Sequence, residues 1–191
     1  MRRAARRPRP GPPGRGDDPR VLALLRRPDG PDVTDTTSQA YDAIRALEYR
    51  YARLLDEDRL EEWPKLFVER GVYKVIPREN LARQPALPIF FCDSRAMMVD
   101  RVKSLREANV YNLHYSRHVV SNIEVLSARD DTFEVAACYT VYQTDLEGQT
   151  RLFSVGQYRD VISNGAGEFR FREKIAVCDT FNIPNLLAIP L

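Results

Sequence analysis

The first regular pattern in the chain is a helical one. Apolar residues recur at intervals of three and four from residue 40, which places them on one face of a helix: Ala40, Ile44, Leu47, Tyr51, Leu54 and Leu55. Thr36, Thr37 and Ser38 stand before this run and are good N-cap candidates. The acidic stretch 56–58 is predicted to end the helix.

Shorter elements are predicted next. Residues 60–66 indicate a second helix, anchored by Trp63 and Phe67, with Pro64 near its first turn. Gly71 then turns the chain into a short strand over 72–76, and 77–88 is an irregular stretch with three prolines. A strand over 89–92 precedes a helix that closes near residue 109. Asp93 or Ser94 would cap that helix, and its apolar face is Met98, Val102 and Leu105.

From residue 116 the apolar period changes to two, which predicts strands near 116–127, 132–145, 150–163 and 168–180. Turn-forming residues separate them at 130–131, 147–148 and 164–167. The more apolar parity is Val119, Ile123, Val125, Phe133, Val135, Tyr139, Val141, Phe169, Phe171, Ile175 and Val177. The opposite parity carries Glu124, Thr140, Arg170, Arg172 and Lys174, and the third strand is ambiguous on both faces. Helices on one face of a curved antiparallel sheet define an α+β, cone-shaped domain.

Composition separates a tail from this domain. Residues 1–36 hold nine arginines, seven of the thirteen prolines and four of the nine glycines. Such a segment is predicted to be disordered, because it buries too little apolar surface to offset its ordering entropy. Its arginines could contact phosphates, although an incidental extension is the simpler interpretation. The single folded domain is predicted over 37–191.

The remaining composition narrows the class of protein. The chain has 29 basic and 27 acidic residues, which argues against a nucleic-acid-binding protein. It has no apolar run of membrane-spanning length. Three cysteines without a CxxC pair fit a reducing cytoplasm.

Candidate chemistry is sparse. His114 and His118 lie in a predicted strand, where four residues span about 13 Å, so a shared metal ion is not expected. Glu173 has the apolar parity, with Gln157 or Arg159 predicted opposite it. A desolvated glutamate there could be a general base, although a structural ion pair with Arg159 is the simpler interpretation.

Several runs resemble a known family. LLDEDRLEEWPKLF (54–67), with Gly71 and Tyr73 after it, resembles the opening of nuclear-transport-factor-2-like (cystatin-like) domains. DRVKSLREANVY (100–111), SRHVVSNIEV (116–125), REKIAVCDT (172–180) and IPL (189–191) are similar to the small (beta) subunit of Rieske non-haem iron aromatic-ring-hydroxylating oxygenases. Within that family the chain looks most like subunits of enzymes for aromatic acids, of the terephthalate, salicylate and anthranilate type.

This resemblance implies a structural, non-catalytic subunit of an NAD(P)H- and O2-dependent dioxygenase of aromatic catabolism. The large (alpha) subunit would carry the Rieske [2Fe–2S] cluster and the mononuclear Fe(II), so no catalytic, cofactor-binding or metal residue is expected in this chain. The implied assembly is an alpha3beta3 hexamer, with only indirect contacts to ferredoxin or reductase. The mixed polar sheet face (Glu124, Thr140, Arg170 and Arg172) could meet the partner subunits of the oxygenase.

Two alternatives stay open from the residues. One is a stand-alone pocket enzyme of the same fold, an isomerase, dehydratase or cyclase, with Glu173, Asp56 and Tyr73 as its acid–base candidates. The other is a ligand- or protein-binding module without enzymatic context.

Overall fold

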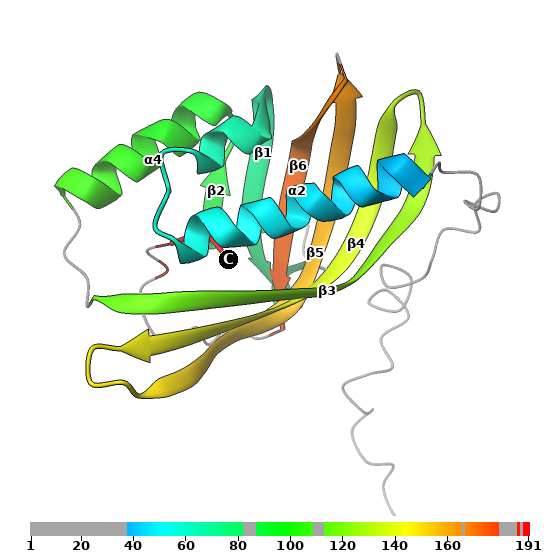
Figure 1. Ribbon diagram of the computed structural model, residues 1–191. Helices are drawn as coiled ribbons and strands as arrows, with labels where there is room; N and C mark the ends of the chain where they lie inside the picture. The colour runs from blue at the N-terminus through cyan, green and yellow to red at the C-terminus, as the bar shows by residue number, and fades with distance from the viewer. Residues whose placement is uncertain (1–37, 82–86, 109–112, 166, 180–186, 188) are drawn as a thin grey trace, which may run out of the picture.

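The computed structural model describes residues 38–81, 87–108, 113–165, 167–179, 187 and 189–191. A long helix, α2 (Ser38–Asp56), crosses one face of a strongly curved six-stranded sheet (Figure 1). The elements that follow α2 are η2 (Trp63–Leu66), β1 (Phe67–Pro77), α3 (Arg78–Leu81), β2 (Phe90–Cys92), α4 (Arg95–Glu107), β3 (His114–Arg129), β4 (Thr132–Asp145), β5 (Thr150–Gly165) and β6 (Glu168–Cys178). The predicted tail 1–36 and the boundary at residue 37 lie outside the described residues.

The sheet has the strand order β2-β1-β6-β5-β4-β3. Strands β3 to β6 form the predicted antiparallel meander, but β1 pairs with β6 in parallel. The prediction of a wholly antiparallel sheet was therefore wrong at this one place. The reason is topological: β1 and β6 are far apart in sequence, and apolar periodicity reports which strands exist but not which distant strands pair.

Helix α2 buries the apolar face that its sequence predicts. Ile44, Leu47, Tyr51, Leu54 and Leu55 all lie in the core. The helix ends at Asp56, and two residues later Asp58 takes a left-handed backbone conformation (φ 55°). The N-cap candidates Thr36 and Thr37 lie outside the described residues. Hydrogen bonds from β3 to Asp56 hold the last turn of this helix against that strand.

The short elements differ in detail from the prediction. The second helix is a single 3-10 turn with Pro64 in its first positions, and β1 begins at Phe67 rather than at residue 72. Gly71 lies inside β1 at a register irregularity, where a side chain would come within 2.8 Å of Phe67 Cβ. Ser94 caps α4 by accepting a hydrogen bond from the Met97 amide, and Met98, Val102 and Leu105 are buried as predicted.

The hairpins confirm the predicted strands, and the backbone conformation of the turn residues accounts for the tight connections between them. Asp130 and Asp131 both have positive φ (46° and 57°) between β3 and β4, the backbone that a tight two-residue hairpin turn needs. Gly148 and Gly167 supply positive φ in the next two turns. These tight connections hold β3, β4, β5 and β6 in one continuous meander.

Two bulges reverse the predicted faces. In β3 the register shifts between Ser121 and Glu124, where Asn122 has a φ of 52°. One extra residue moves every side chain before it to the other face. Val119, predicted to be buried, is therefore 48% exposed, and His118, predicted to face outward, is buried.

A bulge in β6 likewise moves side chains to the face opposite the predicted one. Val161 pairs with Glu173 and Ile162 with Phe171, so Arg172 is the extra residue. Lys174, predicted on the polar face, is fully buried, and Glu173, predicted on the apolar face, points outward. Among the described helices, none is both long enough and apolar enough to cross a membrane.

Candidate functional site

The buried histidine and an aspartate form a pair inside the cone. Asp56, at the end of α2, accepts hydrogen bonds from the backbone N–H of His118 at 3.0 and 3.1 Å. Its Oδ1 atom lies 2.7 Å from Nδ1 of the His118 ring, and its side chain is almost fully buried. Arg117, exposed on the other face of β3, has its guanidinium 3.6 Å from Oδ2. Asp56, one of the acid–base candidates, is thus hydrogen-bonded to His118, which the strand periodicity had predicted to face outward.

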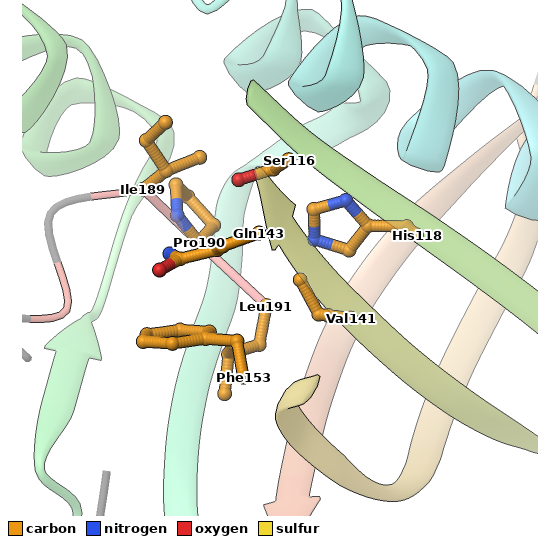
Figure 2. Close-up of a pocket in the computed structure, with 8 residues that line it drawn as sticks. All are labelled: Ser116, His118, Val141, Gln143, Phe153, Ile189, Pro190 and Leu191. Atoms are coloured by element: carbon orange, nitrogen blue, oxygen red, sulfur yellow. The ribbon is translucent and has the colours of Figure 1, made fainter. Parts of the chain in front are cut away.

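This pair borders a small pocket (Figure 2). The pocket has a volume of about 10 Å³ and is lined by Ser116, His118, Val141, Gln143, Phe153, Ile189, Pro190 and Leu191. In Figure 2 the His118 ring lies on one side and Ile189 and Pro190 on the other. Such a volume suits one water molecule and is far below that of a site for an organic substrate.

Tyr73, the second candidate, is a structural anchor. Its hydroxyl donates to the main-chain oxygen of Leu191 (3.1 Å) and accepts from the Leu191 N–H (2.8 Å). Tyr51 donates to the same oxygen at 2.5 Å. Burial is the main cause that raises the pKa of Tyr73 far above its usual value, so its hydroxyl stays neutral. The two tyrosines therefore hold Leu191, which lines the pocket, in place.

Glu173, the third candidate, does not reach the pocket. It is partly exposed and forms an ion pair with Lys74 of β1 (2.8 Å), and Val161 is its cross-strand neighbour. The predicted neighbours Gln157 and Arg159 pair instead with Val177 and Ile175. The bulge at residue 172 is the physical reason for this correction.

A buried charge cluster was missed by the sequence reasoning. Lys174 Nζ lies 2.8 Å from Glu48 Oε2 and 2.8 Å from Asp160 Oδ2, and the lysine and both carboxylates are buried. The ammonium also lies 3.7 Å from the centre of the Tyr158 ring. The signals were present: Glu48 lies on the helical face of Ile44 and Tyr51, and Asp160 has the parity of Tyr158.

One lysine for two carboxylates leaves this cluster short of positive charge. Burial is the largest cause that raises the pKa of Asp160 well above its usual value. Lys174 opposes this increase, and the neighbouring Glu48 carboxylate adds to it. The cluster therefore favours a proton on Asp160, which reduces the uncompensated charge in the core.

His114, the other histidine, lies in β3 as predicted, with its Nε2 atom 3.1 Å from the side-chain nitrogen of Gln143. Within the described residues, no three His, Cys, Asp or Glu side chains come together as metal ligands would. Thus this part of the chain offers no set of ligands that fits a Rieske cluster or a mononuclear iron.

The outer face of the sheet is more apolar than predicted. On adjacent strands β3, β4 and β5, large apolar side chains are between 38% and 67% exposed: Tyr115, Val119, Tyr142, Leu152 and Val155. Tyr142 pairs with Leu152, and Val119 and Val155 both pair with Thr140, so these residues share one face. We call these five residues the outer apolar patch. Contiguous patches of this kind mark interaction surfaces.

Solved structures with the same fold define the class of domain. The beta subunit of a putative aromatic-ring-hydroxylating dioxygenase from Novosphingobium aromaticivorans is 37% identical, with a TM-score of 0.74 over 80% of this chain and 97% of its own. A putative scytalone dehydratase from the same organism shares the fold alone, at 17% identity and a TM-score of 0.59 over 80% of this chain and 99% of its own. The domain is nuclear-transport-factor-2-like.

Sequence comparison gives the family. The family model described as ring hydroxylating beta subunit matches residues 50–185, and the chain belongs to that family. It is 35% identical to the anthranilate 1,2-dioxygenase small subunit of Burkholderia cepacia, over 78% of this chain and 92% of the relative. It is 34% identical to beta subunit 1 of the terephthalate 1,2-dioxygenase oxygenase component of Comamonas sp., over 78% and 96%. The chain is therefore a small-subunit component of a ring-hydroxylating oxygenase.

Proposed function

We propose that this chain is the structural small subunit of a dioxygenase for aromatic carboxylic acids. The substrate class rests on its relatives: those named for anthranilate and terephthalate are 34–35% identical, whereas the benzene dioxygenase beta subunit is 26% identical. The large subunit would hold the Rieske [2Fe–2S] cluster and the mononuclear Fe(II), which supply electron transfer and oxygen activation. Electrons from NAD(P)H would reach that subunit through a reductase chain, without passing through this one.

The observation that carries the structural role is the outer apolar patch. An apolar surface on three adjacent strands is costly to leave in water, and the family supplies one partner for it, the large subunit. Three copies of each subunit in a closed ring, alpha3beta3, would bury it repeatedly. The three cysteines are free, in keeping with a reducing cytoplasm.

The test is co-purification of this chain with its large subunit. Leu152→Asp should lower the amount of bound large subunit, because it places a charge in the patch, directly opposite Tyr142. Val99→Asp is the matched control, since Val99 on α4 is exposed to the same extent (51% against 52%). Equal thermal stability of both variants shows that they fold. A complex of normal yield with Leu152→Asp would contradict the proposed surface.

The catalytic proposal is tested separately. The assembled complex should consume O2 with anthranilate or terephthalate in preference to benzene, and native mass spectrometry should give three copies of each chain. The isolated small subunit should hold no iron and oxidise neither acid. Stoichiometric iron in that sample would overturn the division of labour between the subunits.

The stand-alone pocket enzyme has one feature in its favour, the Asp56–His118 pair, and one against it, the size of the pocket beside that pair. Of its other candidates, Tyr73 holds the main chain of Leu191 and Glu173 pairs with Lys74. Glu173→Gln should therefore leave the activity of the complex unchanged and alter stability by less than about 1 kcal/mol.

A further inference from the structure

In the Asp56–His118 pair, one ring nitrogen of His118 makes no hydrogen bond to any described residue. The His118 side chain is 1% exposed, yet its Nε2 atom has no hydrogen-bond partner among the described residues. Buried polar atoms in native proteins are nearly always paired, either with protein groups or with ordered water. Since no described residue supplies one, this orphaned nitrogen calls for a further partner.

The chemistry of the pair fixes which kind of partner fits. An ionised carboxylate only accepts hydrogen bonds, so the contact between Nδ1 and Asp56 places the ring proton on Nδ1. In the neutral ring Nε2 is then an acceptor. In the imidazolium it carries a proton and donates, so the partner must be able both to donate and to accept, as water can.

The pocket fixes the size and the second contact. Its volume of about 10 Å³ suits one water molecule. Of the other polar side chains lining it, Gln143 is engaged on both ends of its amide, by His114 and Arg151. The Ser116 hydroxyl, which can donate or accept, is the second contact on the pocket wall. Val141, Phe153 and Leu191 close the remaining sides.

We propose that this pocket is a binding site for a single water molecule, which forms one hydrogen bond with Nε2 of His118 and a second with the Ser116 hydroxyl. The Asp56–His118 pair thus serves an internal water and not an organic substrate. That water would join His118 and Ser116, two residues of β3, beside the wall formed by Ile189–Leu191. This inference concerns the inside of the cone and is independent of the subunit role proposed for the outer patch.

The first test is nitrogen NMR of the full chain labelled with ¹⁵N-histidine. There are two histidines, so His114→Asn and His118→Asn assign the signals. We expect the His118 ring to carry a proton on Nδ1, the Nε2 shift of a hydrogen-bonded nitrogen and a magnetisation-exchange signal to a long-lived water. Added benzoate, a small aromatic acid, should leave these signals unchanged. An Nε2–H tautomer, or a His118 signal that titrates with benzoate, would overturn the proposal.

The second test fills the site. Ser116→Val replaces the hydroxyl with methyl groups that occupy the water's space, so the water signal should be lost and the Nε2 shift should move to that of a nitrogen without a hydrogen bond. Ser121→Val, on the same strand but exposed, is the matched control and should change neither. A crystal structure of the wild-type chain gives a readout that needs no variant. Density for one water within hydrogen-bonding distance of Nε2 and the Ser116 hydroxyl supports the site, and a pocket without density refutes it.

Discussion

Replacing Lys174 by Met tests whether the buried charge cluster is held together by its single cation. Methionine has a similar length and packs in the same apolar surroundings, so the main loss is the positive charge. The ammonium is 2.8 Å from both the Glu48 and Asp160 carboxylates, and all three groups are buried. Removing one member of a buried ion pair typically costs about 3–5 kcal/mol, because the charge left behind has no partner.

The size of the effect at a given pH follows from proton uptake. Without Lys174, the negative charge left on the buried carboxylates either stays unpaired in the core or is neutralised by proton uptake. Above the pKa that such a group has in the unfolded chain, taking up one proton costs about 1.4 kcal/mol more for each pH unit, so about 2.7 kcal/mol of the loss should disappear between pH 7 and pH 5. The destabilisation by Lys174→Met should therefore shrink by more than half between these two pH values.

Urea unfolding of the full chain at pH 7 and pH 5 measures both numbers, from the midpoint and the slope of each transition. Lys74→Met is the matched control, since Lys74 forms a partly exposed pair with Glu173 and such pairs are worth at most about 1 kcal/mol. Adding Glu48→Leu to Lys174→Met should recover part of the loss. A loss below about 1 kcal/mol at pH 7, or one that is equal at both pH values, would refute this account.

Three other changes probe the same core. The raised pKa of Asp160 means that its contribution to stability is present below about pH 3.9 and is lost as the pH rises through its folded value, so Asp160→Asn should flatten this part of a stability–pH curve. Tyr73→Phe removes both hydrogen bonds to Leu191 and should cost about 1–3 kcal/mol, with faster hydrogen exchange at the Leu191 amide. Gly156→Ala would place a methyl group 2.0 Å from the Val177 carbonyl and should lower the melting temperature markedly, while Gly165→Ala, with open space around it, should not.

Much of the fold was predictable because local patterns determine it. The helix over 38–56 follows from its apolar face, and the four meander strands follow from their period of two and from the turn residues between them. The family followed from short runs of sequence in the right order, and the match over residues 50–185 confirms it. These signals are local, so one sequence carries them.

The candidate site was harder to predict because it depends on single-residue shifts. One extra residue at Asn122 turns His118 inward, and one at Arg172 exchanges the places of Glu173 and Lys174. Neither bulge has a sequence signal strong enough to override the alternation on both sides of it. The sequence identified Asp56 as a candidate, but its partner His118 was predicted to face outward and is buried.

The sequence by itself determined the elements, their order and the kind of protein, since helical and strand periods, turn residues and family motifs are properties of short segments. Only the tertiary structure decided which faces are buried, that β1 joins β6 in parallel, and that Glu48, Asp160 and Lys174 meet in the core. The physical reason is that register and long-range pairing are settled by the packing of distant segments against one another, and a strand's alternation does not record where a bulge will reverse it.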